Sequence, residues 1–157
     1  MAIECVAMLL AGGRGTRLNL IAARRAKPAV PFAGIYRIID FTLTNVMISG
    51  LRHVGVLTQY RPTSLMEHIG DGESWDLLGH NSTLSILPPS LGREHSDWYR
   101  GTADAVYQNL AFVDGLNPRH VIILSGDHIY HMDYRPMMAR HLQADADMTV
   151  AAMVVPW

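Results

Sequence analysis

Four continuous apolar runs lie along the chain, separated by more polar segments. They cover residues 3–10, 53–58, 120–124 and 148–155. Each run is apolar throughout rather than alternating with polar residues, which is typical of strands that are covered on both faces. The pattern therefore predicts four buried strands.

The segments between these runs favour helices. Residues 40–49 carry apolar positions at helical spacing and are followed by Gly50, which predicts a stop. Residues 64–67 have the spacing of a capping box and predict a short helix to about Ile69. Thr102 is predicted to cap a helix that runs to Val113, with Asp104 in its first turn, and residues 134–143 predict a fourth helix.

Strands that alternate with helices predict an α/β fold, a Rossmann-like and mostly parallel sheet with helices on both faces. In such sheets a ligand binds at the carboxyl ends of the strands. Residues 70–97 interrupt the alternation, because they are rich in Gly, Ser, Asn and Pro around a short apolar piece at 84–87. We interpret them as a loop that covers the site.

Composition narrows the class of protein. The 157 residues, 49% hydrophobic, suffice for one domain with a core, and the net charge of −1 gives no reason to expect a nucleic acid or an acidic membrane as partner. Cys5 is the only cysteine, which excludes an internal disulfide and favours a reducing, cytoplasmic setting. The N-terminus lacks the features of a signal peptide, and no apolar run is long enough to cross a bilayer.

The stretch LAGGRGTRL at residues 10–18 follows the first predicted strand. Glycines let the backbone approach a ligand, successive main-chain N–H groups form a concave anion site, and arginines add donors for phosphate oxygens. This chemistry suggests a nucleoside triphosphate. Gly15-Thr16-Arg17 replaces the Gly-Lys-Ser/Thr of a Walker loop, and Leu18 replaces the third glycine of a dinucleotide fingerprint. An ordinary strand-to-helix turn is the alternative.

Asp127 follows the predicted strand 120–124, where a carboxylate faces the site. Mg²⁺ prefers one or two carboxylates together with phosphate oxygens and water, so Asp127 is a candidate ligand. The alternative is a turn aspartate that caps nearby N–H groups. His128 and His131 are three residues apart, but no further ligand cluster stands near them, so we interpret them as ordinary polar residues and not as a zinc site.

Lys27 belongs to a short basic run that shortly follows the Gly-rich stretch. Its charge is suited to neutralise the α- or leaving phosphates, as is that of Arg17, although such runs are often only solvated loops. Gln59 is either a reader of a base edge or a surface residue. The stretch WYRGTAD at 98–104 is either part of a base or sugar pocket or a hydrophobic anchor beside a helix start.

Taken together, these stretches resemble the N-terminal nucleotidyltransferase domain of the bacterial glucose-1-phosphate adenylyltransferases (ADP-glucose pyrophosphorylases). The first stretch is shared by many sugar nucleotidyltransferases, whereas WYRGTADA and GDHIY are more specific to the ADP-glucose branch. The matching stretches are LAGGRGTRL (10–18), RAKPAV (25–30), RIIDF (37–41), TQY (58–60), WYRGTADA (98–105) and GDHIY (126–130).

The resemblance implies transfer of an adenylyl group from ATP to α-D-glucose 1-phosphate, giving ADP-glucose and pyrophosphate with Mg²⁺ as cofactor. It implies catalytic roles for Arg17, Lys27 and Asp127, with Asp127 as the metal ligand, and contact between Tyr99 and glucose 1-phosphate. The ATP-binding residues it implies are Leu10, Ala11, Gly12, Gly13, Gly15, Thr16, Arg17, Gln59, Gly101, Thr102 and Ala103.

The family is also allosteric, and the resemblance implies a small-molecule effector and a homo-oligomer, a tetramer for full-length members. Arg24, Arg25 and Arg37 fall where effector-binding basic residues occur, and Gln59 and Trp98 match positions tied to coupling between the sites. Arg24 stands where some relatives have Lys and Pro31 where some have His, which leaves the choice of effector open.

Family members continue beyond Trp157 with the rest of the catalytic domain, including a second Mg²⁺ carboxylate, and a β-helix domain. We therefore expect residues 1–157 to be the N-terminal portion of the transferase domain, with part of the ATP half-site and poor or no turnover alone. Two alternatives are another NTP–sugar pyrophosphorylase that uses UTP, dTTP or GTP, and a non-catalytic subunit that binds only nucleotide or effector.

Overall fold

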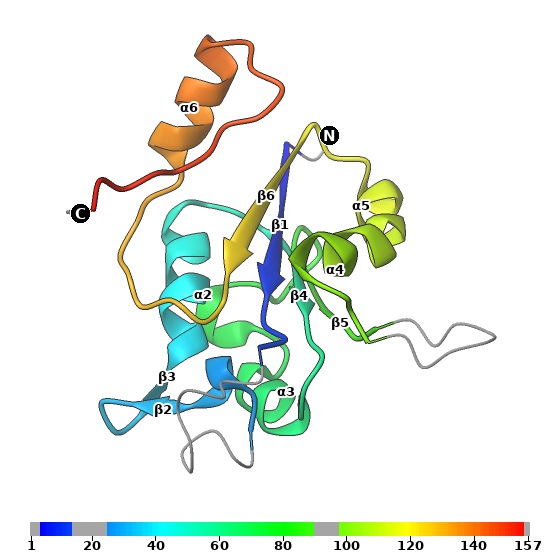
Figure 1. Cartoon of the computed structure of the whole chain (residues 1–157), viewed down its shortest axis with the longest axis vertical. Helices are drawn as coiled ribbons and strands as arrows, with labels where there is room; N and C mark the ends of the chain where they lie inside the picture. The colour runs from blue at the N-terminus through cyan, green and yellow to red at the C-terminus, as the bar shows by residue number, and fades with distance from the viewer. Residues whose placement is uncertain (1–3, 14–24, 90–97, 156–157) are drawn as a thin grey trace.

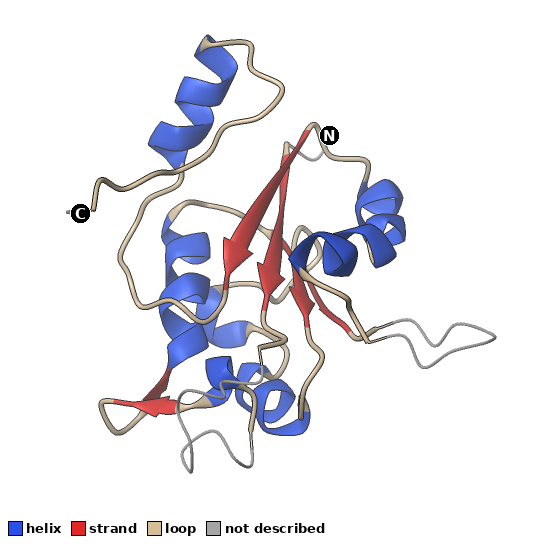
Figure 2. Cartoon of the chain, viewed as in Figure 1, coloured by secondary structure: helices blue, strands red, loops and turns tan. Residues whose placement is uncertain are grey.

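A four-stranded parallel sheet forms the centre of the computed structural model, which describes residues 4–13, 25–89 and 98–155. Its strands all point the same way in Figures 1 and 2 and lie in the order β5-β4-β1-β6. The strands are β1 (Cys5–Leu10), β4 (His53–Leu57), β5 (Thr83–Leu87) and β6 (His120–Ser125). The predicted parallel α/β fold is confirmed, and its carboxyl edge gathers the ends of all four strands.

Helices cover both faces of the sheet, as the apolar runs predict. Ala7 and Leu9 of β1 pack in one core with α2 (Ile38–Ile48) and α3 (Thr63–Ile69). Val6 and Met8 point to the other face, toward α4 (Thr102–Gln108) and α5 (Leu110–Leu116). Because β1 is buried from both sides, its sequence is apolar without alternation.

Smaller elements lie near the carboxyl edge. The short helix η2 (Lys27–Ala29) is followed by a hairpin of β2 (Pro31–Phe32) and β3 (Tyr36–Arg37), and all three lie below the strand ends in Figure 1. The helix η3 (Glu73–Trp75) follows α3, and α6 (Arg135–Gln143) follows β6. No helix in the described part of the chain has both the length and the apolar character needed to span a membrane.

Helix α2 behaves as predicted, since Ser49 caps its C-terminus and Gly50 follows with a φ of 72°. A buried asparagine on α2 then fixes the chain after β6. Asn45 Nδ2 donates to the carbonyl of Tyr130 at 3.1 Å, and its Oδ1 accepts from the N–H of Met132 at 3.1 Å. One side chain thereby satisfies a donor and an acceptor of a loop that has no regular structure.

We expected residues 70–97 to form a loop over the site, but residues 70–89 do not form one. They contain η3 and β5, and β5 pairs in parallel with β4 from Thr83 to Leu87 at the edge of the sheet. The N–H of Thr58 donates to the carbonyl of Leu87 at 2.9 Å and extends this pairing. Residues 90–97 lie outside the described residues.

The single helix predicted from Thr102 to Val113 is also wrong, because Asn109 divides it into α4 and α5. The side-chain nitrogen of Asn109 donates to the carbonyl of Ala105 at 2.8 Å and to the hydroxyl of Tyr99 at 2.9 Å. An asparagine that bonds to nearby backbone competes with regular helix geometry, which explains the break.

The predicted capping box at residues 64–67 does not form. Helix α3 begins at Thr63 after Pro62, and no side chain caps it. The hydroxyl of Ser64 instead accepts a hydrogen bond from Nη1 of Arg37 at 2.7 Å. A tertiary partner has therefore replaced the local one that the spacing suggested.

The fourth predicted strand is absent, because residues 148–155 have no regular structure and pair with no described strand. Their large apolar side chains are exposed, from 65% for Val155 to 98% for Val154. The preceding helix α6 forms as predicted but buries none of its residues, and Figure 1 shows it standing apart from the sheet. The apolar run alone predicted a strand, but no sheet edge receives it.

Candidate functional site

The ends of three adjacent strands, β4, β1 and β6, are joined by backbone hydrogen bonds at the carboxyl edge. The N–H of Ala11, just after β1, donates to the carbonyl of Leu57 at the end of β4 at 2.9 Å. The N–H of Gly126, just after β6, donates to the carbonyl of Leu10 at 3.0 Å. The segments that leave these strands therefore start side by side, and they carry the Gly-rich stretch, Gln59 and Asp127.

Lys27 and Asp127 form an ion pair at this edge, although they are 100 residues apart in sequence. Nζ of Lys27 lies 2.9 Å from Oδ2 of Asp127, and each side chain is about one third exposed, at 34% and 33%. The N–H of Lys27 donates to the carbonyl of Gly13 at 3.3 Å, and a Cβ built on Gly13 would lie 3.9 Å from Oδ2 of Asp127. Three separately predicted site residues therefore meet in one place.

The carboxylate of Asp127 is held at both oxygens. Ser125 donates from its hydroxyl to Oδ1 at 2.6 Å, while Lys27 donates to Oδ2. Burial by itself raises the pKa of Asp127, but the hydrogen bonds from Ser125 and Lys27, with the charges of Lys27 and His128, outweigh it and lower the pKa below its usual value. The carboxylate is therefore ionised at neutral pH, the form that a metal ligand requires.

Gln59 lies directly beside the start of the Gly-rich stretch. A Cβ on Gly12 would approach the Cβ of Gln59 to 3.0 Å and its Oε1 to 3.5 Å, so glycine is what allows the two segments to lie this close. Nε2 of Gln59 donates to the carbonyl of Tyr99 at 3.3 Å. Gln59 thus connects the Gly-rich stretch with the WYRGTAD segment, two regions that the resemblance assigns to ATP.

Tyr99 is partly buried, and its hydroxyl bonds to protein groups. The hydroxyl donates to the carbonyl of Leu87 at 3.0 Å and accepts from Asn109. Burial raises the pKa of Tyr99, the bond from Asn109 partly offsets this, and Asp104 raises it further. Its contact with glucose 1-phosphate stays a prediction, and in this structure its hydroxyl ties β5 to the break between α4 and α5.

The start of α4 is exposed at Gly101, Thr102 and Ala103, the residues predicted to meet adenine. Asp104 in the first turn accepts from the N–H of Arg100 at 2.9 Å, which fixes the entry to the helix. Trp98 is 49% exposed and makes contacts within the chain. The contact of this segment with adenine stays a prediction.

The predicted effector residue Arg37 forms a second cluster, between α2 and α3. Its Nη1 donates to the carbonyl and the hydroxyl of Ser64 at 2.5 and 2.7 Å, and its N–H donates to Oδ2 of Asp40 at 2.9 Å. Nε2 of His68 lies 2.6 Å from Oδ1 of the buried Asp40. The predicted effector residue Arg25 is half-buried, two residues before Lys27.

Four of the predicted site residues lie outside the described residues: Gly15, Thr16, Arg17 and Arg24. The sequence interpretation in turn missed Ser125, Asp40 and His68. Ser125 stands two residues before Asp127, close enough in sequence for its hydroxyl to reach the carboxylate. Asp40 and His68 are 28 residues apart and gave no local signal.

The described residues contain no group of three or more His, Cys, Asp or Glu that could enclose a metal ion. The interpretation of His128 and His131 as ordinary polar residues stays a prediction. Asp127 alone, ionised and partly exposed at the strand ends, suits a Mg²⁺ ion that takes its remaining ligands from phosphate and water. It does not suit a structural zinc site, which needs about four protein ligands.

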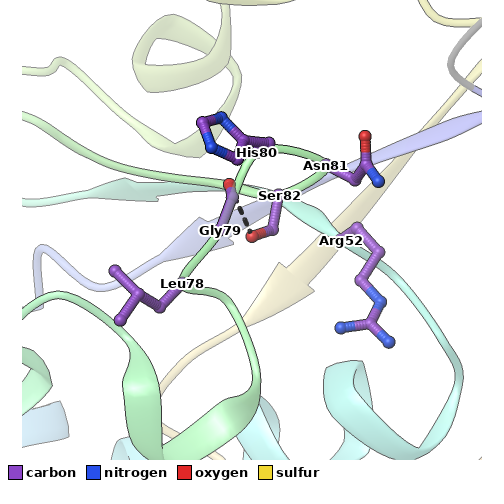
Figure 3. A pocket seen from close by; sticks show the side chains of 6 residues that line it. All are labelled: Arg52, Leu78, Gly79, His80, Asn81 and Ser82. Carbon is purple, nitrogen blue, oxygen red and sulfur yellow. Dashed lines mark hydrogen bonds between the residues drawn. The ribbon is translucent and has the colours of Figure 1, made fainter.

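A cavity of about 360 Å³ lies at the opposite, amino-terminal edge of the sheet (Figure 3). Arg52 and residues 78–82 line it, and none of them belongs to the predicted site. The carbonyl of Gly79 accepts a hydrogen bond from the hydroxyl of Ser82 there, so this segment forms a closed turn. This cavity therefore lies apart from the predicted site residues, which gather near the carboxyl edge.

Comparisons with a family model and with curated proteins both match this chain to nucleotide-transferring enzymes. The family model described as nucleotidyl transferase matches residues 6–157. The chain is similar to glucose-1-phosphate adenylyltransferases of Desulforamulus reducens (54% identical, 98% of this chain, 39% of the relative), Thermotoga maritima (57%, 96% and 36%) and Bacillus licheniformis (54%, 100% and 41%). The chain thus spans about two fifths of the length of the curated relatives that it matches.

Proposed function

Because this chain belongs to the nucleotidyl transferase family, we propose that it carries the ATP-binding half of a site that makes ADP-glucose. The reaction joins an oxygen of the glucose 1-phosphate to the α-phosphorus of ATP and breaks the bond to the β-phosphate, which releases pyrophosphate. Relatives at 54–57% identity named glucose-1-phosphate adenylyltransferase support this choice of nucleotide and sugar.

The Lys27–Asp127 pair beside Gly13 is the observation that carries the proposal. Transfer between phosphates needs little covalent help, since catalysis rests on alignment and on neutralising the charge of the phosphates. A cation, an ionised carboxylate and a glycine backbone at one sheet edge supply the groups for both tasks. Pairing of β1 with β6 brings the two segments together, and at that place they present a cation and a carboxylate in contact.

We propose roles for the described residues from the family resemblance, and their positions near the carboxyl edge support these roles. The backbone at Leu10, Ala11, Gly12 and Gly13 would lie against the triphosphate, and Lys27 would neutralise the phosphates next to the attacked phosphorus. Asp127 would hold Mg²⁺, which when bound neutralises phosphate oxygens and helps the pyrophosphate to leave. Gln59 and the exposed residues 101–103 would contact the adenine, and Tyr99 the sugar phosphate.

We also propose that Arg25 and Arg37 contribute to an anion site for a small-molecule effector. The guanidinium of Arg37 is held against Ser64 on α3, the helix that follows the Gln59 segment. Helices α3 and α2 both contact η2, which carries Lys27. An anion that drew Arg37 away from Ser64 would therefore act close to the proposed catalytic lysine. A homo-oligomer and a cytoplasmic location remain predictions from the family resemblance.

Calorimetric titration with Mg-ATP and with Mg-UTP tests the proposal. We expect tighter binding of Mg-ATP, and we expect Asp127→Asn to weaken it by about tenfold or more, since a charge-assisted contact is lost. The matched control is Asp76→Asn, which removes an exposed carboxylate that is paired with Arg52 near the amino-terminal edge of the sheet. Equal binding of both nucleotides, or binding that ignores Asp127, would contradict the proposal.

A further inference from the structure

Lys27 is the only lysine in the sequence, and the rest of the 13 Lys and Arg residues are arginines. Lysine and arginine side chains bind a carboxylate in different ways. The planar guanidinium of Arg binds both carboxylate oxygens as a fork, whereas the ammonium of Lys is a compact charge on a flexible stem. The one lysine stands against Asp127, where it bonds to a single oxygen, Oδ2.

The two oxygens of Asp127 are bound by partners of different kinds. Oδ1 accepts from the neutral hydroxyl of Ser125, the last residue of β6. The carbonyl of Ser125 accepts in turn from the hydroxyl of Thr42 on α2 at 3.0 Å. Oδ2 accepts from the lysine ammonium and faces Gly13. A cation that approaches Asp127 can therefore leave the Ser125 bond intact, but at Oδ2 it must compete with Lys27.

We propose that Lys27 is an exchangeable counter-ion: it occupies Oδ2 of Asp127 until a divalent cation takes that oxygen, and the released ammonium then turns to the phosphates of the nucleotide. This rests on the proposed function, since it assumes that Asp127 is the metal ligand. It adds that the lysine and the metal compete for one oxygen atom. The divalent cation and the released ammonium of Lys27 then both neutralise the charge of the nucleotide.

The surroundings of Lys27 permit this exchange. Its backbone is fixed, because its N–H bonds to Gly13 and the carbonyl accepts from Val30 at 3.1 Å, so only the side chain needs to move. Both partners of the ion pair are about one third exposed. Exposed pairs of this kind are weak, so a divalent cation is able to displace the ammonium.

Coupling between metal and nucleotide follows from the exchange. A metal that releases Lys27 strengthens binding of the phosphates, and by linkage a nucleotide that engages Lys27 strengthens binding of the metal. Without nucleotide, however, Lys27 opposes the metal. The distinctive consequence is that removal of a lysine from the proposed site improves metal binding to the free protein.

Titration of the nucleotide-free protein with Mn²⁺, followed by the electron paramagnetic resonance signal of the free ion, tests this consequence. We expect Lys27→Met to bind Mn²⁺ about two- to fivefold more tightly than the unsubstituted protein, which is the range set by loss of an exposed ion pair. The matched control is Arg52→Met, which removes an equal charge that is paired with Asp76 near the amino-terminal edge of the sheet, away from the carboxyl edge. Its affinity for Mn²⁺ should not change, and Asp127→Asn should lose binding.

The outcomes separate the exchange from the proposed function. If Asp127→Asn binds Mn²⁺ as well as the unsubstituted protein does, the metal assignment fails and the exchange fails with it. If Asp127→Asn loses binding but Lys27→Met binds no more tightly, only the exchange is overturned. An equal gain in Arg52→Met would mean that net charge, and not the Lys27–Asp127 contact, controls the affinity, which also overturns it.

A second measurement needs no substitution. Because Lys27 is the only lysine, reductive methylation with ¹³C-formaldehyde labels only its Nζ and the N-terminal amine, and the methylated ammonium keeps its charge. We expect the Lys27 methyl signal to move as Mg²⁺ is added without nucleotide, while the N-terminal signal stays in place. A Lys27 signal unchanged at Mg²⁺ concentrations that saturate the site would overturn the exchange.

Discussion

Cys5, the single cysteine, lies in β1 with its thiol buried between the helices. Burial raises the pKa of Cys5 to about 11; a hydrogen bond with the backbone of Ile122 lowers it in part, and the charge of Glu4 adds to the rise. Since only the thiolate reacts, this environment makes the residue inert in the folded protein. It packs as a small apolar side chain.

We predict that Cys5 reacts with an aromatic disulfide reagent at pH 8 at least about a hundredfold more slowly in the folded protein than in guanidinium chloride. The reason is that a rise of about two pH units in its pKa lowers the thiolate fraction by that factor, and burial blocks access as well. Release of the coloured thiolate measures both rates. Equal rates would mean that β1 is not buried as described.

Asp133 holds the start of α6 through Arg135. Its carboxylate accepts from the side chain of Arg135 at 2.7 and 3.0 Å and from its N–H at 2.9 Å. These bonds, the side-chain ones first, lower the pKa of Asp133 from 3.8 to about 2. A group with a lowered pKa stabilises the folded state above its usual pKa and loses that contribution as the pH falls.

We therefore predict that Asp133 titrates near pH 2 and that its stabilising contribution disappears between about pH 4 and pH 2. Titration of its side-chain carboxyl by ¹³C NMR measures the pKa. Arg135→Gln removes the main donor and should return the pKa toward 3.8. The same low value in Arg135→Gln would show that Arg135 is not the cause.

At the scale of elements, the approach of α5 to the sheet depends on a glycine in β4. A Cβ on Gly55 would lie 2.7 Å from Cδ1 of Leu87 and 2.8 Å from Cε1 of Phe112. Contacts that short do not occur, so a larger residue would push β5 and α5 away from β4. The glycine therefore sets how closely three elements pack.

Gly55→Ala should lower the free energy of unfolding by about 1–3 kcal/mol, the usual range for an overpacked core. Gly115→Ala is its matched control, because Gly115 lies in α5 with open space around it. Alanine favours a helix over glycine, so this variant should be neutral or gain up to about 1 kcal/mol. Urea unfolding followed by circular dichroism compares the two, and equal losses would contradict the packing explanation.

At the scale of the whole molecule, one side of the sheet is only partly covered. Helices α4 and α5 pack over β1 and β4, but on the edge strand β6 Val121 is 42% and Ile123 is 53% exposed on that face. Apolar residues 148–155 are exposed as well. An edge strand with an open apolar face is a common place for chains to associate.

The 157-residue chain should therefore self-associate as its concentration rises, and Ile123→Lys should reduce this association. A charge on an edge strand disfavours pairing with a second chain. Sedimentation velocity over a range of concentrations measures the effect. The control is Ile35→Lys, which places the same charge at the exposed turn between β2 and β3. A similar reduction in both variants would show that β6 is not the contact.

The sequence by itself determined most of the sheet and the chemistry placed on it. Continuous apolar runs predicted β1, β4 and β6, because strands buried on both faces leave that pattern locally. Gly12 and Asp127 were singled out by residue type and by their position after a strand, and Lys27 by a basic run that shortly follows the Gly-rich stretch. The resemblance supplied the family, which the family model supports for residues 6–157.

The tertiary structure alone decided which of these residues meet and which apolar segments find a partner. The Lys27–Asp127 contact joins positions 100 residues apart, and Asp40 meets His68 across two helices, so no local spacing announces either pair. Residues 83–87 became a strand while 148–155 did not, although the second run is longer and more apolar. The fold brings residues 83–87 into register beside β4 and does not bring residues 148–155 beside any described strand, and register is a property of the folded sheet.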